Sequence, residues 1–404
     1  MGYIYSGSPP PPTRNKVKEV LPVNILFVLG TRPEAIKLAP VILAMEADGR
    51  GCRPLICNTE QQKELAGAAL SFFGLRADFK LDAMTADQGL AGLQARLISA
   101  LDTVYAAGDI DGTVVQGDTM SAFCGALVSF YHRRPVFHVE AGLRSGDLAE
   151  PFPEEGFRRL IAPLAALHFA PTETNRARLM AEGIRPKTIT VTGNTVVDAL
   201  RLLPPALLAE AAEFFRDQGV SQPTVLITIH RRENHGARLQ RLLAAIKTLA
   251  AAHPELDWVI PVHPHPKVKE AVISHLGGLD HVFLFPPLIY PRLIYLLQSS
   301  RLVLTDSGGL QEEAAALGRP IVVLRYKTER VESLAAGLSE LVGAEADRLI
   351  ARSEALLSKA SEAPTSNSAQ VKNDIYGDGR SSRMIVSLIE SYYARAEKPP
   401  GGNL

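Results

Sequence analysis

The feature that most constrains the fold of this 404-residue chain is a regular alternation of short β-branched runs with helical stretches. Such alternation is typical of a parallel sheet covered by helices, because parallel strands need crossover connections. The pattern runs from Val23 to Gly193 and restarts between Thr224 and Arg325. We therefore predict an α/β fold of two doubly wound units that face each other across a cleft, where the ligand binds.

The predicted elements fall into two groups. In the first group, strands are expected at 23–30, 53–59, 112–118, 135–142, 167–171 and 188–193, with helices at 34–46, 61–73 and 121–132. In the second group, strands are expected at 224–230, 256–263, 281–287, 300–309 and 319–325, with a helix at 239–252. A long amphipathic helix is expected from Ser381 to Ala396.

These elements predict the domain organisation. We expect a flexible tail at 1–22, a first domain at 23–193 that also includes 383–397, and a second domain at 194–382. The hinge is expected near Thr192 to Asp198, and the residues from Lys398 onward are expected to fray.

Composition excludes several classes of function. Lys plus Arg equals Asp plus Glu at 43 each, so no basic excess indicates nucleic acid or an anionic membrane as partner. The sequence has no apolar run long enough for a membrane span and no signal-peptide core near its start. Its three cysteines, Cys52, Cys57 and Cys124, form no CxxC pair, which favours buried, reduced thiols. We expect a cytoplasmic protein.

Carboxylates gather in the segment HVEAGLRSGDLAEPFPEEGFRR, from His138 to Arg159. Glu140 lies just past the apolar run of a predicted strand, at its carboxyl end, and Glu154 and Glu155 follow a Pro-rich loop. Ligands of open α/β sheets bind beyond the carboxyl ends of the strands, so these acids are candidates for acid/base chemistry. The alternative is that they form structural ion pairs with nearby arginines, which are Arg144, Arg158 and Arg159.

Two further strand ends open helices with residues suited to anions. In GTRPEAIKLAP, Arg32 stands at a helix N-terminus, where an anion is stabilised. In TDSGGLQEEAAALGRP, the triplet Ser307, Gly308 and Gly309 leaves backbone N–H groups free for a phosphate, although ordinary helix capping is the alternative. Neither segment is GxGxxG, so a nicotinamide cofactor has no support.

Three other residues complete the candidate site. His230, in HRREN, follows a strand and adjoins two arginines, which favours an anion ligand. Asp118 follows another strand and is either an acid/base group or a helix cap. Glu313, or its neighbour Glu312, has the acceptors needed to bind a ribose diol. No HxxxH, DxD or cysteine set supplies a metal site, so we predict neither a metal site nor a cofactor.

Taken in order, these segments resemble the non-hydrolysing UDP-N-acetylglucosamine 2-epimerases. The resemblance extends from about Gly30 to Gly379 and is carried by GTRPEAIKLAP, QGDT, HVEAGLRSGDL, PEE, FAPTET, GNTVVDAL, HRREN, LTDSGGLQEE, TER and YGDG. It implies a GT-B-like fold of two Rossmann-like domains, a homodimer, and reversible C2 epimerisation of UDP-GlcNAc to UDP-ManNAc through 2-acetamidoglucal. The resemblance implies no metal and no nicotinamide.

The resemblance also implies a role for individual residues. The catalytic candidates are Asp118, Glu140 and Glu154 as acid/base groups, with His230 and Arg32 stabilising the diphosphate. The other substrate-binding candidates are Lys37, Arg158, Ser307, Gly308, Gly309, Glu313 and Arg330. Family members bind a second, activating UDP-GlcNAc, and the residues expected at that site here are Gln61, Gln62, Lys63, Arg231 and His263.

Three other functions stay open at this point. A hydrolysing relative, or an epimerase of a modified UDP-sugar, is the first, although HVEAGL stands where the hydrolysing branch has an HGGE-like segment. A GT-B glycosyltransferase is the second, although clustered carboxylates favour proton transfer over transfer to an acceptor. A non-catalytic nucleotide-sugar-binding protein is the third, although the candidate acids are all retained.

The sequence departs from the family pattern at several positions. Phe157 stands where the family usually has Asn, and Pro163 belongs to a pair that is usually polar. In the activator segments, Gln62 and Lys63 replace His and Arg, and His265 replaces Asn. Near the TER motif, the departures are Tyr326 and Val331.

We predict weak or absent activation by UDP-GlcNAc. Gln62 cannot become cationic as His can, and Lys63 lacks the planar fork that binds phosphate with two hydrogen bonds. The reverse reaction from pure UDP-ManNAc should therefore begin without a lag. An initial-rate curve checks this, and a long lag that a trace of UDP-GlcNAc abolishes would contradict it.

Overall fold

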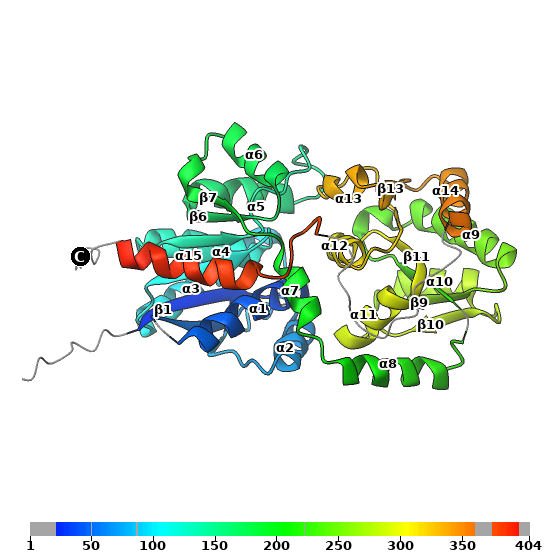
Figure 1. Ribbon diagram of the computed structural model, residues 1–404, viewed down its shortest axis with the longest axis horizontal. Helices are drawn as coiled ribbons and strands as arrows, with labels where there is room; N and C mark the ends of the chain where they lie inside the picture. The colour runs from blue at the N-terminus through cyan, green and yellow to red at the C-terminus, as the bar shows by residue number, and fades with distance from the viewer. Residues whose placement is uncertain (1–21, 50, 86–87, 222, 360–373, 396–404) are drawn as a thin grey trace, which may run out of the picture.

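The computed structural model describes residues 22–49, 51–85, 88–221, 223–359 and 374–395. The chain forms two halves that lie side by side, each built on its own sheet (Figure 1). Of the tail expected at 1–22, residues 1–21 lie outside the described residues, as does the end of the chain from residue 396. No helix within the described ranges is long and apolar enough to cross a membrane.

The first half contains a seven-stranded sheet in the order β3-β2-β1-β4-β5-β6-β7, with every pair parallel. β1 pairs with β2 on one side and β4 on the other, so the strand order reverses there and leaves a crevice at the carboxyl ends. The strands are β1 (Val23–Leu29), β2 (Cys52–Asn58), β3 (Phe79–Lys80), β4 (Gly112–Gln116), β5 (Val136–Val139), β6 (Ala165–Ala170) and β7 (Ile189–Val191).

The second half repeats this architecture with a six-stranded parallel sheet in the order β10-β9-β8-β11-β12-β13. Its order reverses between β8 and β11, which again marks a ligand-binding edge. The strands are β8 (Thr224–Thr228), β9 (Asp257–Pro261), β10 (Val282–Phe285), β11 (Ser300–Thr305), β12 (Ile321–Val323) and β13 (Ser339–Leu341).

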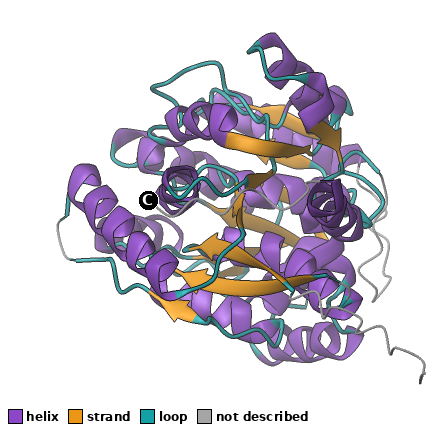
Figure 2. Cartoon of the chain, turned by 90° about the vertical axis from the view of Figure 1, so that its left-hand side faces the viewer, coloured by secondary structure: helices purple, strands orange, loops and turns teal. Residues whose placement is uncertain are grey.

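Helices cover both faces of the strands (Figure 2), which explains why the central strands are apolar throughout rather than alternating. In the first half they are α1 (Arg32–Asp48), α2 (Lys63–Phe72), α3 (Leu90–Ala107), α4 (Met120–Tyr131), α5 (Glu154–Ile161) and α6 (Glu173–Ala181). In the second half they are α8 (Pro205–Asp217), α9 (Ala237–Ala252), α10 (Pro266–Leu276), α11 (Tyr290–Ser299), α12 (Gly308–Ala316), α13 (Val331–Ala335) and α14 (Ala346–Lys359).

The helix α15 (Ser381–Arg395) returns across the chain to the first half, where it packs against α1 (Figure 1). The rings of Tyr392 and Tyr393 lie 5.4 and 6.0 Å from that of Phe137 in β5. The Tyr393 hydroxyl also donates to the carbonyl of Asp111 at 2.9 Å. The short helix α7 (Thr195–Arg201) packs against α1, α15 and α12, so it lies where the two halves meet.

The predicted α/β fold with two Rossmann-like sheets is confirmed. The three cysteines are free and buried, as the sequence predicts. Sequence analysis did not name the helix α3, although Leu93, Leu97, Leu101 and Val104 repeat at helical spacing and are all buried. That periodicity was available in the sequence, but a search for β-branched runs overlooks it.

Phe157 has a packing role in α5. Its ring stacks on that of Phe123 from α4 at 5.3 Å, with 9° between the planes, and both belong to one hydrophobic cluster. This contact explains how an apolar residue is accommodated where relatives carry Asn. The side chain therefore faces the core between α4 and α5.

Candidate active site

The segments that follow strand ends in one half meet those that follow strand ends in the other. Arg158, in α5 after β5, donates to Glu329, after β12, at 2.8 Å. Arg32, after β1, donates to the carbonyl of Leu288, after β10, at 3.1 Å. These contacts bring together the carboxyl edges of both sheets, where a ligand of an α/β protein is expected.

Glu140 lies at the centre of this region. It directly follows β5 and has a φ of +63°, a left-handed conformation that costs a non-glycine residue free energy and often marks a functional site. Its carboxylate accepts from Lys37, Gln116 and, at 3.4 Å, Asn194. Burial, with a smaller contribution from Glu312 that Lys37 opposes, raises the pKa of Glu140 to about 7.

Lys37 joins Glu140 to a second carboxylate from the other half of the protein. Its ammonium lies 2.5 Å from Glu312 in α12, and Arg330 donates to the same carboxylate at 2.9 Å. Burial alone would raise the pKa of Glu312, but Lys37 and Arg330 together outweigh it and hold that pKa low. Of the two carboxyls that share Lys37, Glu140 is therefore the one that exchanges a proton near neutral pH.

Asp118 is held by an arginine rather than used as a helix cap. Its carboxylate accepts from Arg158 at 2.7 and 2.5 Å, whereas Thr119 caps α4 through its own hydroxyl. The structural ion-pair alternative applies to Glu155, which is fully buried and pairs with Arg158 and Arg159, both at 3.1 Å. Arg144, the third arginine considered, pairs with Glu182.

Glu154 differs from its neighbour Glu155 in that, among the described residues, it forms no ion pair with an arginine, although the charges of Arg231 and Arg158 act on it from a distance. It is the first residue of α5, and one of its carboxylate oxygens is buried without a hydrogen-bond partner in the described part of the chain. Burial, and then the charge of Asp118, raises the pKa of Glu154. Such a group is suited to accepting or donating a proton.

The predicted phosphate cradle forms the start of α12. Ser307 is the N-cap residue of this helix, and its hydroxyl accepts from the amide of Leu310 at 3.5 Å. Gly308 has to be small, since a Cβ there would lie 2.6 Å from the guanidinium of Arg330. The capping alternative is thus realised, while the helix N-terminus still offers a site for an anion.

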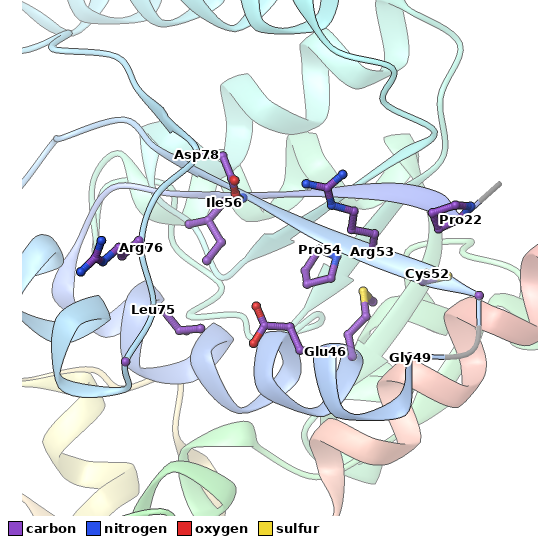
Figure 3. A pocket seen from close by; sticks show the side chains of 13 residues that line it. Pro22, Glu46, Gly49, Cys52, Arg53, Pro54, Ile56, Leu75, Arg76 and Asp78 are labelled. Atoms are coloured by element: carbon purple, nitrogen blue, oxygen red, sulfur yellow. Dashed lines mark hydrogen bonds between the residues drawn. The ribbon is translucent and has the colours of Figure 1, made fainter.

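Glu313 lies beside the cradle in a narrow cavity of about 40 Å³ that Arg32 and Tyr290 also line. Burial raises the pKa of Glu313 to about 7, against the opposing charges of Arg32 and Lys37. Ligand pockets usually have volumes of about 300–1,000 Å³, so this cavity is only part of the space that a small-molecule ligand would occupy. A larger cavity of about 610 Å³ lies by the amino-terminal ends of β1 and β2, on the wrong side of the sheet for this site (Figure 3).

His230 follows β8 and pairs with Asp306 at 2.9 Å. Asp306 is fully buried and also accepts from the backbone amides of His230 and Arg231 and from Asn234. Burial would raise the pKa of Asp306, but these partners, His230 first, lower it to about 2. The histidine ring is thus oriented by an ionised carboxylate, and 40% of its side chain remains exposed.

The residues proposed for an activator lie in two places. At the start of α2, Gln61 accepts from Ser121 at 2.9 Å, Gln62 accepts from the amide of Arg32 at 3.1 Å, and Lys63 pairs with Asp82 at 3.1 Å. In the second half, burial, and then the charges of neighbouring histidines, lower the pKa of His263. Arg231 adjoins His230 in the same half. The activator assignment stays a prediction.

Sequence analysis did not single out three residues in the network around the candidate acids, Gln116, Asn194 and Glu329, and it considered Glu312 only as an alternative to Glu313 for a ribose. Gln116, Asn194 and Glu329 belong to the recognised segments QGDT, GNTVVDAL and TER, and Glu312 precedes Glu313. Their motifs indicated that they matter, but their partners are distant in sequence. Within the part of the chain that the structure describes, no group of three or more His, Cys, Asp or Glu side chains could hold a metal ion.

Glu34 ties the GTRPE segment to the neighbouring GDT segment. One oxygen accepts from the amides of Gly30 and Thr31, at 3.1 and 2.9 Å, and from the Thr31 hydroxyl at 2.8 Å. The other oxygen accepts from the Thr119 hydroxyl at 2.6 Å. Burial raises the pKa of Glu34 to about 7 although these hydrogen bonds oppose the shift.

Two parallel Rossmann-like sheets that present carboxylates and helix N-termini to one shared edge define a GT-B-like enzyme acting on a nucleotide sugar. The comparisons with known proteins agree. A sequence model of the family described as "UDP-N-acetylglucosamine 2-epimerase" matches residues 45–390. This chain belongs to the UDP-N-acetylglucosamine 2-epimerase family.

Individual relatives cover nearly the whole chain. The UDP-N-acetylglucosamine 2-epimerase of Salmonella typhimurium is 40% identical over 376 residues, which is 92% of this chain and 99% of that protein. The crystal structure of the Neisseria meningitidis UDP-GlcNAc 2-epimerase bound to UDP-GlcNAc matches with 37% identity and a TM-score of 0.81, covering 91% of this chain and 100% of that one. A putative UDP-N-acetylglucosamine 2-epimerase from Listeria monocytogenes matches with 35% identity and a TM-score of 0.83, covering 95% and 100%.

Glu34 generates a prediction about stability and pH. Because its pKa is about 7 in the folded protein and 4.5 in the reference state, the folded chain keeps a proton that the unfolded chain loses between these values. The contribution of Glu34 is therefore fully present below the lower pKa and is lost as pH rises to about 7. Between these two pKa values, the unfolding free energy of Glu34→Gln should therefore fall less than that of the wild type, by on the order of 3 kcal/mol. Chemical denaturation at several pH values measures it, and an unchanged slope would contradict the assignment.

Proposed function

We propose that this chain interconverts UDP-GlcNAc and UDP-ManNAc by eliminating UDP and adding it back. The observation that carries the proposal is Glu140, a buried carboxyl with a pKa of about 7 that meets a lysine and a second carboxylate at the edge where the halves join. A carboxyl with this pKa exists in both protonation states at neutral pH, which reversible proton transfer requires. The neighbouring carboxyls Asp118 and Glu154 provide further acid/base groups.

The reaction balances without an outside reagent. A base takes the proton from C2, the electrons of that C–H bond form a C1=C2 double bond, and the C1–O bond breaks as UDP leaves. The products are 2-acetamidoglucal and bound UDP. In the return step, UDP oxygen adds to C1 and a carboxylic acid delivers a proton to the other face of C2, which inverts this carbon.

The three carboxyls suit different parts of this sequence. A base and an acid on opposite faces of the sugar are needed, and we assign these roles among Asp118, Glu140 and Glu154. Lys37 forms an ion pair with Glu140. Its positive charge would make the protonated Glu140 carboxyl more acidic, which favours transfer of the Glu140 proton to C2. Arg158 orients Asp118 through charge-assisted hydrogen bonds.

The leaving diphosphate would be stabilised by groups that need no metal or nicotinamide. Arg32 and His230 supply donors from the two halves, and the N-terminus of α12 at Ser307 to Gly309 supplies backbone amides. We assign Glu313, which lines the same cavity as Arg32, to the ribose, and Arg330 packs on Gly308 at the start of α12. A cleft that closes on its ligand would keep the glucal from water.

A glycosyltransferase reaction is the main alternative, because it would use the same fold and the same nucleotide site. Three carboxyls near one strand edge, two of them with raised pKa values, favour proton transfer instead. We further propose that the chain acts as a cytoplasmic homodimer and that the domains divide at 194 and 383 as the sequence predicts. These proposals follow from the resemblance.

Replacing the acids tests the proposed chemistry. Asp118→Asn, Glu140→Gln and Glu154→Gln should each lower turnover by about a hundredfold or more, the usual contribution of an acid/base group. Arg159→Gln is the matched control, because Arg159 is exposed on the same helix and pairs with Glu155. Turnover is measured by separating the two UDP-sugars. Near-normal turnover in one of the three variants would remove that residue from the mechanism.

Replacing the donors tests the diphosphate site. Arg32→Ala and His230→Ala should each weaken UDP binding by about tenfold or more, because each loses a charge-assisted contact. Isothermal titration calorimetry with UDP measures this. Unchanged affinity in both variants would show that the diphosphate binds elsewhere, whatever happens to turnover.

A further inference from the structure

Glu329 is a fully buried carboxylate that no part of the proposed mechanism uses. It lies between β12 and α13, in the second half of the protein, and its side chain is 0% exposed. It contacts the guanidinium groups of Arg158 at 2.8 Å, Arg325 at 3.1 Å and Arg330. These arginines outweigh the effect of burial and hold the pKa of Glu329 well below its usual range, so it is ionised.

One of these arginines leads from Glu329 to Asp118. The same Arg158 side chain that donates to Glu329 also donates to Asp118, at 2.7 and 2.5 Å, and to Glu155 at 3.1 Å. Arg158 belongs to α5 in the first half and is only 3% exposed. The position of Asp118 therefore depends on an arginine that is fixed partly by the opposite half.

A second arginine leads from Glu329 to Glu140. Arg330 donates to Glu329 and, through Nε at 2.9 Å, to Glu312. Glu312 lies 2.5 Å from Lys37, which in turn bonds to Glu140. One carboxylate in the second half is thus connected to two of the proposed acid/base groups in the first half, by separate routes.

Glu329 also balances charge where an imbalance would be costly. The three arginines that it contacts are all at least 94% buried, and a buried cation without a partner destabilises a protein by several kcal/mol. Without the Glu329 charge, the guanidinium groups of Arg158 and Arg330 would have to form their ion pairs with other carboxylates. The nearest ones in the network are Asp118 and Glu312.

We propose that Glu329 is a positioning residue, which sets the geometry of Asp118 through Arg158 and that of Glu140 through Arg330, Glu312 and Lys37. The proposal rests on the acid/base roles given above. It predicts that catalytic geometry is complete only when the two halves are together, since both routes cross between them.

The test compares Glu329→Gln with the wild type in turnover, UDP affinity and stability. Glutamine keeps the shape but removes the charge, so turnover should fall by about tenfold to a hundredfold, as small misplacements of catalytic groups do. UDP affinity should fall by a smaller factor than turnover, because Glu329 contacts the substrate-binding candidates Arg158 and Arg330 but none of the proposed diphosphate donors. A general loss of folding would instead lower both by the same factor.

The control variant is Glu332→Gln. Glu332 lies three residues further along and accepts from Thr172 of the first half at 2.6 Å, but it contacts none of these arginines in the described structure. Its turnover should stay within about twofold of the wild type, because this partly buried contact joins the two halves without reaching the arginines that hold the candidate acids. An equal loss in both variants would show that any contact between the halves has this effect, and would overturn the proposal.

A double variant shows whether Glu329 acts through Asp118 and its partners. In Asp118→Asn/Glu329→Gln, the combined loss of turnover should be smaller than the product of the two single losses, because the route through Arg158 ends at Asp118 and only the route to Glu140 is left to disturb. Multiplying losses would contradict the proposal. If Glu329→Gln does not fold, the same cycle with Glu329→Asp, which keeps the charge but shortens the side chain, replaces it. The proposed function is tested separately, by measuring exchange of the C2 proton in the wild-type protein. A wild type that turns over its substrate without this exchange would refute the proposed function rather than the role of Glu329.

Discussion

The structure depends on a buried set of ion pairs that joins its two halves. Lys37, Arg158, Arg325 and Arg330 meet Asp118, Glu140, Glu312 and Glu329 in a region that is largely closed to solvent. Burying a charge costs free energy unless an oppositely charged group lies within hydrogen-bonding distance. These side chains therefore have to form their ion pairs with one another. Several partners come from the opposite half. The same contacts that hold the halves together therefore position the candidate catalytic groups.

The competition among these charges also explains why similar carboxyls differ. Glu312 is close to two cations and is held ionised, whereas Glu140 shares one of them and keeps a pKa of about 7. Glu155 forms ion pairs with two arginines and has a structural role. Among the described residues, the adjacent Glu154 forms no such ion pair, and the charge of Asp118 raises its pKa. Neighbouring residues of one type thus acquire different chemistry from their surroundings.

The sequence was sufficient to predict the fold and most of the regions that form the site. Strands that are apolar throughout, followed by loops with Gly, Asp, His or Glu, indicate parallel sheets and mark their carboxyl edges. It was not sufficient for pairings between distant residues. Asp118 at the end of β4 could equally have capped α4, and only the structure shows that Thr119 does so and leaves Asp118 to Arg158.

The same limit applies to residues with no distinctive type or spacing. Glu329 is one acid in a short TER segment, and nothing near it in sequence indicates that it meets an arginine 171 positions earlier. Gln116 and Asn194 bind Glu140 from separate strand ends, which no local pattern connects. Phe157 was conspicuous as a departure from relatives, yet its partner Phe123 lies on a different helix.

The central claim is that the C2 proton of the sugar is removed and replaced at this site. The most direct measurement is to incubate the purified protein with UDP-GlcNAc in D2O and examine both UDP-sugars by NMR and mass spectrometry. The account predicts UDP-ManNAc as product, with deuterium at C2 in the product and, as the reaction reverses, in the substrate pool. Epimerisation without deuterium at C2, or release of UDP with no epimer formed, would contradict it.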